Sequence, residues 1–231
     1  MKIVKRLILI ILIVLVLIAS FFIYNGYKMY KDAITAVSLE KKIYELKNDV
    51  SYVSSNDVPD YYKNAIIAVE DHRFKEHGAI DIIAIGRAIV SNIQAKELNE
   101  GGSTITQQVA KNLYFIRENN FAYRKIAEIF LAFDLEKNYS KDDILEFYFN
   151  TIYFGNGYYG IKEASNGYYK KEPKDLTLYE ATLLAGVPNA PSVYAPTVNP
   201  DLAKNRQGKV IRSMVEYGYL TQEEADNITS E

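Results

Sequence analysis

Residues 104–113 predict an α-helix, and they read Thr104-Ile105-Thr106-Gln107-Gln108-Val109-Ala110-Lys111-Asn112-Leu113. Thr104 followed three residues later by Gln107 has the form of a capping box, which begins a helix. Ile105, Val109 and Leu113 recur at helical spacing and form an apolar face that is expected to pack against a core. The polar side chains of Gln107, Gln108 and Lys111 are then expected on the opposite face.

Similar signals recur outward from this segment. Side chains that cap a helix stand in front of three further apolar segments, and a glycine separates the last two. These positions are Ser140 with Asp143, Thr177 with Glu180, Thr221 with Glu224, and Gly218. The chain contains no alternating strand pattern of useful length and no internal repeat. The sequence therefore predicts an all-α fold.

The N-terminal segment predicts a membrane anchor. From Leu7 to Ile23 every residue except Ser20 is apolar, and no charge follows until Lys28. At ~1.5 Å per residue, a helix of this length crosses a hydrocarbon core of ~30 Å. Basic residues precede the run, which favours a cytoplasmic N-terminus with the remainder outside. We therefore expect a cytoplasmic segment at 1–6, an anchor at 7–27, a juxtamembrane linker or helix at 28–56, and one domain at 57–231.

A cleaved signal peptide is the alternative interpretation of this segment. Its apolar region is usually only ~7–15 residues long and ends at a small-x-small site. Ala19-Ser20 followed by Phe21-Phe22 fits that pattern poorly. An uncleaved signal anchor is the better prediction.

The composition excludes several classes of function. The 231 residues are 48% hydrophobic and carry a formal net charge of −2, so the broad basic field of a nucleic-acid-binding protein is missing. The chain has no cysteine, which excludes disulfides, thiolate metal sites and cysteine nucleophiles. Its two histidines, His72 and His77, lie off the i, i+4 spacing of a helical metal pair.

Three groups of residues could carry chemistry. Glu70 and Asp71 follow an apolar segment, and they are either solvated at a helix end or held in a cleft where one has a raised pKa for proton transfer. Glu128 lies four residues after Arg124, which is also the spacing of an ordinary surface ion pair. Residues 100–104 join two glycines to a helix N-terminus, an arrangement that suits either a flexible connection or an oxyanion or phosphate site.

The order of these groups resembles the peptidoglycan glycosyltransferases of family 51. The five segments of the resemblance lie in the family's order between residues 60 and 200. They are AVEDHRFKEH (68–77), GSTITQQVAKNL (102–113), RKIAE (124–128), ILEFYFN (144–150) with GNGYYGI (155–161), and EATLLAG (180–186) through PSVYAP (191–196). The second segment is the most specific of the five.

This resemblance implies a lysozyme-like helical head, a smaller membrane-proximal jaw and a groove between them. The end at Glu231 leaves no space for the transpeptidase domain of bifunctional relatives, so we expect a monofunctional enzyme. The implied reaction joins lipid II to the growing lipid-linked glycan through a β-1,4 bond, inverts the anomeric centre, and releases undecaprenyl diphosphate. Glu70 would be the general base, and Glu128 the second catalytic carboxylate.

The resemblance also implies partners and ligands. We expect a divalent metal, Mg²⁺ or Mn²⁺, with Glu128 either as its ligand or as the organiser of the basic residues, and no organic cofactor. Partners would be lipid II, the glycan, the membrane and other cell-wall synthesis or division proteins, with no nucleic acid. The expected substrate-binding residues are Asp71, Phe74, Arg87, Ser103, Thr104, Gln107, Gln108, Lys111, Arg117 and Arg124.

The chain departs from the family pattern at two places. Gly78 follows His77 directly, and Ala79 stands where the family has glycine, so we expect tolerance of a small side chain there. The family has an arginine a few residues before the Arg124-Lys125 pair, and Arg117 is the only arginine available for that position.

Two rival functions are a glycan-cleaving hydrolase, which also uses paired carboxylates but needs no cations for a diphosphate, and an inactive membrane scaffold.

Overall fold

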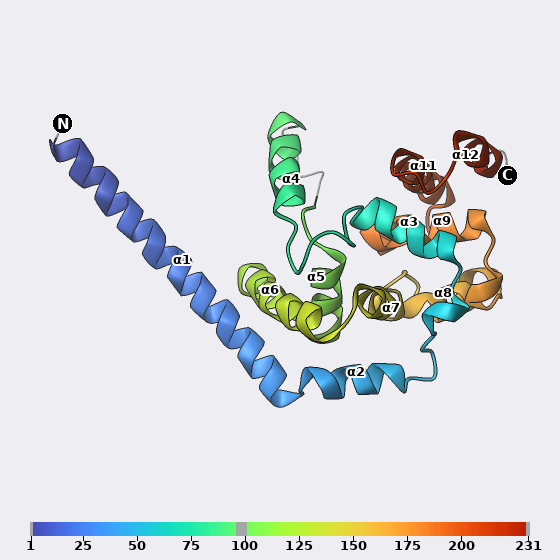
Figure 1. Ribbon diagram of the computed structural model, residues 1–231, viewed down its shortest axis with the longest axis horizontal. Coiled ribbons are helices and arrows are strands. Elements are labelled where there is room, and N and C mark those ends of the chain that lie inside the picture. Colours follow the sequence, from blue (N-terminus) through green and yellow to red (C-terminus); the bar gives the residue numbers. More distant parts are fainter. Residues whose placement is uncertain (1, 96–100, 230–231) are drawn as a thin grey trace.

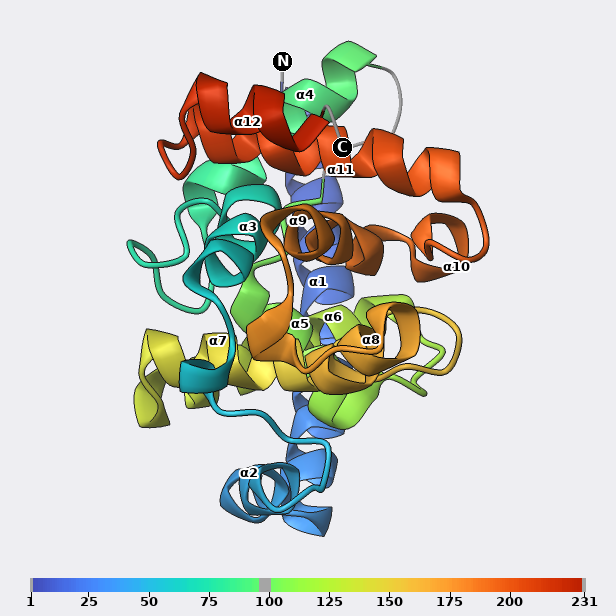
Figure 2. The same ribbon diagram turned by 90° about the vertical axis from the view of Figure 1, so that its right-hand side faces the viewer.

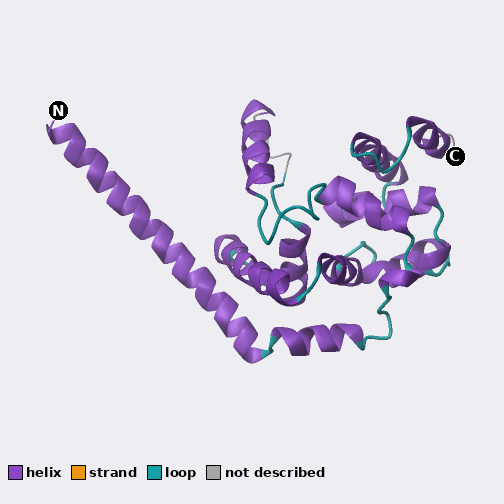
Figure 3. Ribbon diagram, in the orientation of Figure 1, coloured by secondary structure: helices purple, strands orange, loops and turns teal. Residues whose placement is uncertain are grey.

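The computed structural model describes residues 2–95 and 101–229, and these residues form helices joined by loops (Figures 1 and 3). Within these ranges the only pairing of extended backbone is a single antiparallel bridge between Tyr153 and Tyr159. The all-α prediction is confirmed. In chain order the elements are α1 (Lys2–Ala36), α2 (Leu39–Lys47), η1 (Ser55–Asp57), α3 (Asp60–Glu70), α4 (Ile82–Ala95), α5 (Ile105–Ala110), η2 (Lys111–Phe115), α6 (Phe121–Asn138), α7 (Lys141–Thr151), α8 (Gly160–Tyr169), η3 (Pro173–Asp175), α9 (Leu178–Gly186), η4 (Val187–Asn189), α10 (Pro191–Tyr194), α11 (Pro200–Glu216) and α12 (Gln222–Thr229).

The predicted helix starts are confirmed by side-chain caps. Reciprocal capping boxes begin α5, α7 and α9, and the Thr221 and Glu224 side chains make the equivalent bonds before α12. These bonds satisfy amide groups that have no partner within the helix. Gly218 has a φ of +75°, a left-handed conformation that glycine adopts without strain, and it follows the end of α11.

The first helix is long and apolar enough to cross a membrane, as the sequence predicts. It does not stop at residue 27 but continues to Ala36, so the expected linker begins inside α1 and also contains α2. The lower part of α1 packs against α6. A Cβ atom on Gly26 would lie 2.5 Å from Ile126, so this close approach of the two helices requires glycine. The Tyr30 hydroxyl donates to Asp134 across the same contact.

Helices from distant parts of the sequence meet around the site. Helix α3 packs against both α9 and α11, while α5 packs against α6 and α7 (Figure 2). The predicted apolar face of residues 104–113 is confirmed, because Ile105 and Val109 of α5 and Leu113 of η2 are all buried in the core. Burying this face fixes the direction in which the polar side chains of α5 point. The C-terminal end of α3 and the N-terminal end of α5 are consequently held close together.

Candidate active site

A cavity of about 420 Å³ opens where α3, α5 and α11 meet. Glu70, the last residue of α3, contributes its carboxylate to the wall. The predominantly polar lining comes from five separate parts of the chain. Its residues are Ala68, Val69, Glu70, Asp71, His72, Arg87, Gly101, Ser103, Gln108, Asn189, Arg206, Lys209, Ser213, Glu216 and Tyr217. The glycine-containing segment 100–104 was expected to be either a flexible connection or an anion site. Its first residue, Glu100, lies outside the described residues.

The Glu70 carboxylate is nearly buried and only partly bonded. The exposed fraction of its side chain is 11%. Its Oε2 accepts a hydrogen bond of 2.8 Å from Gln108 Nε2, whereas Oε1 accepts none and lies 3.8 Å from Arg206 Nη2. Burial raises the pKa of Glu70 above its ordinary value, although the Gln108 bond and the Arg206 charge oppose the rise. Of the two interpretations of Glu70 offered by the sequence, the structure therefore favours the carboxylate held in a cleft over the one solvated at a helix end. A carboxylate with a raised pKa suits proton transfer.

The carboxylate of Asp71 is bonded differently from that of Glu70, the residue before it. Its Oδ2 accepts from the backbone N–H of Ile105 at 3.0 Å, and its Oδ1 lies 2.7 Å from His77 Nε2. Both oxygens are thus engaged within the protein, although the residue lines the cavity. The contact with Ile105 ties the end of α3 to the start of α5 and so brings Gln108 to Glu70.

Two residues expected to bind substrate, Thr104 and Gln107, cap the start of α5. Gln107 is 2% exposed, and its Oε1 accepts from the Thr104 N–H, so its predicted place on a polar face beside Gln108 is wrong. Capping redirects the side chain toward its own helix start. Thr104 is also 2% exposed, and its hydroxyl donates to the carbonyl of Ala79. Ala79 itself is buried, which agrees with the expectation that a small residue is tolerated there.

The other predicted substrate contacts from the first two motifs differ in position. Phe74 is fully buried in the core beneath Lys141, whose Nζ lies 4.4 Å from the ring centroid, and its expected substrate contact stays a prediction. Arg87 is exposed, lines the cavity and contacts His72 Nε2 at 3.2 Å. Burial, helped by the Arg87 charge, lowers the pKa of His72. Ser103 also lines the cavity, as expected.

Glu128 lies in a clamp of two cations on α6. Its side chain is 3% exposed, with Lys125 Nζ at 2.8 Å from Oε2 and Arg124 Nε at 3.3 Å from Oε1. Lys125 Nζ also donates to Ser103 Oγ at 2.7 Å. Because Ser103 lines the cavity, Lys125 connects the clamp to the wall of the Glu70 cavity. The surface-pair interpretation of Arg124 and Glu128 is therefore too simple, since the carboxylate is buried and has two partners.

The remaining predicted cations lie outside the lining of this cavity. Lys111 is half-buried at the start of the π-helical turn η2, three residues beyond Gln108 and so on the same side of its helix. Arg117 is exposed in the loop that follows. The prediction that Lys111 enters the same groove as Glu70 is not supported by the residues that form the cavity. If Glu70 and Glu128 serve one site, their carboxyl groups are expected to lie about 6–10 Å apart or somewhat more, by analogy with inverting glycosidases, and this separation stays a prediction.

The environment of Glu128 does not fit a divalent cation. Mg²⁺ and Mn²⁺ bind oxygen ligands that are free of competing positive charge, whereas both Glu128 oxygens already face a cationic nitrogen. These contacts favour the second alternative, in which Glu128 organises Arg124 and Lys125. The expectation of a metal in the reaction stays a prediction.

Three cavity residues on or after α11 escaped sequence reasoning. Arg206 and Lys209 supply positive charge to the wall opposite α3, and Tyr217 stacks on His72 with a ring separation of 4.3 Å. The exposed fraction of the Arg206 side chain is only 8%. A signal existed in the spacing of Arg206, Lys209, Ser213 and Glu216, which places polar residues on one helical face.

Comparison with known proteins identifies relatives for most of the chain. The family model described as Transglycosylase matches residues 37–215. Penicillin-binding protein 1F of Bacillus subtilis (strain 168) is 47% identical over 173 residues, which are 75% of this chain and 24% of the relative. Penicillin-binding protein 1A of Neisseria flavescens is 45% identical over 180 residues, 78% of this chain and 22% of the relative. The chain thus spans about a quarter of the length of these curated relatives. A crystal structure of penicillin-binding protein 1A from Haemophilus influenzae aligns with a TM-score of 0.47 and 23% identity, covering 78% of this chain and 17% of that one.

Proposed function

The chain belongs to the transglycosylase family, and from this premise we propose that it is a peptidoglycan glycosyltransferase that polymerises lipid II during bacterial cell-wall synthesis. The observation that carries the proposal is the Glu70 carboxylate. It is nearly buried in a cavity, has one oxygen without a hydrogen bond, and stands among cationic side chains. A base with this environment beside positive charge suits the transfer of a sugar from an anionic leaving group.

In the proposed reaction Glu70 accepts the proton of the 4-hydroxyl on the incoming lipid II. The hydroxyl oxygen forms a bond to the anomeric carbon of the growing glycan, on the face opposite its diphosphate. The bond from that carbon to the diphosphate oxygen breaks, and its electron pair leaves with undecaprenyl diphosphate. The product is a β-1,4 linkage with inverted configuration, and Glu70 releases its proton to solvent before the next cycle.

Positive charge in and beside the cavity would stabilise the leaving diphosphate. Arg87, Arg206 and Lys209 lie in the wall, and the Glu128 clamp keeps Lys125 in contact with Ser103 at its edge. Charge-assisted hydrogen bonds are about twice as strong as neutral ones, and they act most where charge develops in the transition state. In this role Glu128 holds cations in place. Lys111 in segment 102–113, Arg124 in segment 124–128, and Arg117 between these segments would add further positive charge for the diphosphate.

The membrane anchor agrees with a lipid-linked substrate. A polyprenyl chain remains in the bilayer, so the enzyme must act close to the membrane surface. The basic residues before the apolar run support a cytoplasmic N-terminus and a catalytic domain outside the membrane. Helix α4 also presents Ile82, Ile83 and Val90 to the surface, and these exposed apolar side chains are suited to contact with lipid.

A glycan hydrolase is the competing function, and one assay separates the two. The purified full chain in detergent is incubated with labelled lipid II, and the products are resolved by size. We expect glycan chains with wild type and a rate lower by ~10²–10⁴-fold with Glu70→Gln, the usual contribution of a general base. Glu223→Gln on exposed α12 is the matched control and should polymerise normally. Shortened glycan in place of elongation, or wild-type polymerisation by Glu70→Gln, would contradict the proposal. A chelator added to the wild-type reaction tests the metal.

A further inference from the structure

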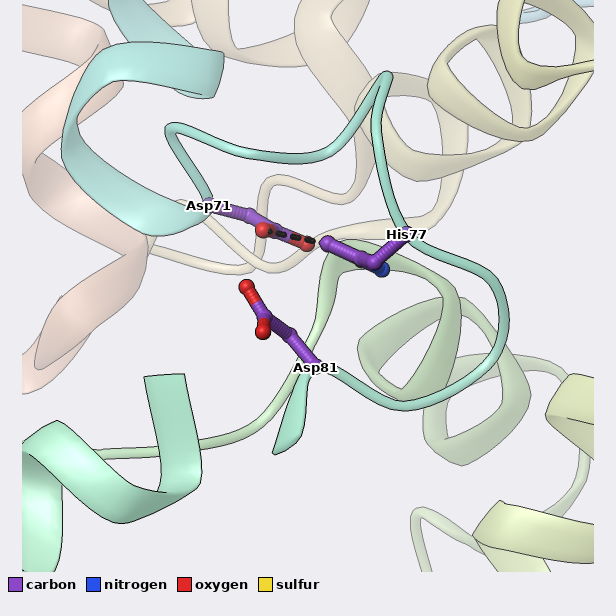
Figure 4. Close-up of side chains that lie close together, drawn as sticks. All are labelled: Asp71, His77 and Asp81. Carbon is purple, nitrogen blue, oxygen red and sulfur yellow. Dashed lines mark hydrogen bonds and ion pairs between the residues drawn. The ribbon is translucent and has the colours of Figure 1, made fainter. Parts of the chain in front are cut away.

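The loop between α3 and α4 holds His77 against Asp71 in an arrangement that fixes the protonation of the imidazole (Figure 4). His77 Nε2 lies 2.7 Å from Asp71 Oδ1, and His77 Nδ1 lies 2.6 Å from the carbonyl oxygen of Gly78. A carbonyl oxygen and a carboxylate oxygen can only accept hydrogen bonds. Since a neutral imidazole has one N–H and an ionised carboxylate has none, both contacts are satisfied beside an ionised Asp71 only when each ring nitrogen carries a proton.

A proton on Asp71 in place of His77 would also satisfy these contacts, but the surroundings of Asp71 oppose it. The other oxygen of this carboxylate accepts from the Ile105 N–H at the start of α5, where a helix N-terminus favours negative charge. The Asp71 and His77 side chains are each 5% exposed. A charge buried to this extent requires a partner, and each of the two supplies it to the other.

The other charged groups around His77 are already committed. Asp81 accepts from the Ile83 and Ala84 amides through Oδ1 and pairs with Arg73 at 3.1 Å through Oδ2. Lys141 on α7 opposes a positive imidazole, but it pairs with Glu136 at 2.7 Å. Asp71, His77 and Asp81 offer ligand atoms within 4.8 Å of one another, a separation that would also suit a metal ion. All of these ligand atoms have protein partners, however, so the cluster is complete as an ion-pair network.

We propose that His77 is a positioning residue that is doubly protonated at neutral pH and, as an imidazolium, neutralises Asp71 beside the Glu70 base. The charge of Asp71 raises the pKa of Glu70, so an uncompensated Asp71 would leave less of the base ionised. The same ion pair keeps Asp71 on the N-terminus of α5, which carries Gln108 to Glu70. The hydrogen bonds from His77 to Asp71 and Gly78 raise the pKa of the imidazole, although burial opposes them.

Nuclear magnetic resonance tests the protonation directly. The chain contains only two histidines, so histidine labelled with ¹⁵N in the full chain gives two ring systems, and His77→Gln assigns them. At pH 7 we expect two protonated nitrogens for His77 and a neutral ring for His72, which serves as the internal reference because its pKa is lowered. A neutral His77 ring at pH 7 would overturn the proposal. So would selective broadening of the His77 signals by added Mn²⁺, which would identify a metal site.

The kinetic test rests on the proposed glycosyltransferase activity. In His77→Gln the acidic limb of the kcat/KM profile should move to higher pH by about one unit, or tenfold in rate on that limb, because a unit charge acts on a nearby buried acid. In the double variant His77→Gln/Asp71→Asn the limb should return, since the uncompensated charge is gone. An unmoved limb in a folded His77→Gln would overturn the coupling to Glu70. If the wild-type protein has no polymerising activity, the proposed glycosyltransferase function is contradicted. The nuclear magnetic resonance measurement would still decide the protonation state of His77.

Discussion

Replacing Arg206 with methionine should move the activity of the enzyme to higher pH. Methionine keeps most of the apolar stem that packs against Gly186 but removes the cation 3.8 Å from Glu70 Oε1. At this distance, with an effective dielectric constant of about 20, the interaction amounts to about 4 kcal/mol. Both side chains are about one-tenth exposed, so bulk water screens the pair only partly. Its loss raises the pKa of Glu70 further and leaves less of the base ionised at neutral pH.

We expect Arg206→Met to lower kcat/KM at pH 7 by about 10- to 100-fold, which corresponds to about 1.4–2.8 kcal/mol. This loss is smaller than the full interaction energy of the pair because the positive charge of Lys209 remains in the cavity wall. Activity should recover as the pH rises. The measurement is a pH series of lipid II polymerisation for wild type, Arg206→Met and Arg212→Met, the last being the same change at an exposed position on α11. An activity loss that is equal at every pH would refute the electrostatic reasoning and assign Arg206 to substrate binding alone.

Three further changes test other parts of the structure. Glu70→Gln should raise the melting temperature at pH 7. Because the pKa of Glu70 is higher in the folded protein than in the unfolded chain, ionised Glu70 destabilises the fold at pH values above its ordinary pKa. An unchanged melting temperature in thermal unfolding experiments would contradict the burial of Glu70. Gly26→Leu should cost about 1–3 kcal/mol by forcing a side chain against Ile126, as measured by thermal unfolding, while Gly86→Ala in open space should not destabilise. Thr104→Ala should cost about 1–2 kcal/mol of unfolding free energy through the lost cap, and lost activity without lost stability would return Thr104 to substrate binding.

The local parts of the fold were predictable from the sequence because their causes are local. A capping box depends on residues three apart, and the apolar face of α5 depends on residues four apart. The sequence therefore predicts where α5 begins and which face Ile105 and Val109 bury. It predicts the direction of Gln107 wrongly, since the general rule for helix faces does not apply to a side chain that turns back onto the Thr104 amide.

The far wall of the site was not predictable in the same way. Arg206 meets Glu70 only because α11 crosses α3, and that crossing follows from packing between segments more than a hundred residues apart. Periodicity indicates that α11 has a polar face, but it does not indicate what the face meets. The sequence does not predict the contact between Lys125 and Ser103 for a similar reason, because this contact joins α6 to a loop that is distant in the chain. The sequence also does not predict the complete burial of Phe74, because a position in a segment does not reveal what packs over it.

The two glutamates of the site show how surroundings divide the work between identical side chains. Glu128 has a cation within 3.3 Å of each oxygen, so its carboxylate is held in two ion pairs on its own helix. Glu70 has one hydrogen bond to a neutral amide and a more distant cation, and burial raises its pKa. The first arrangement fixes cations in place, whereas the second keeps a base ready to accept a proton. Exchanging the roles would require moving Lys125 to Glu70, where its charge would stabilise the carboxylate and weaken the base. The contacts around both carboxylates therefore support the proposed role of Glu70 as the base.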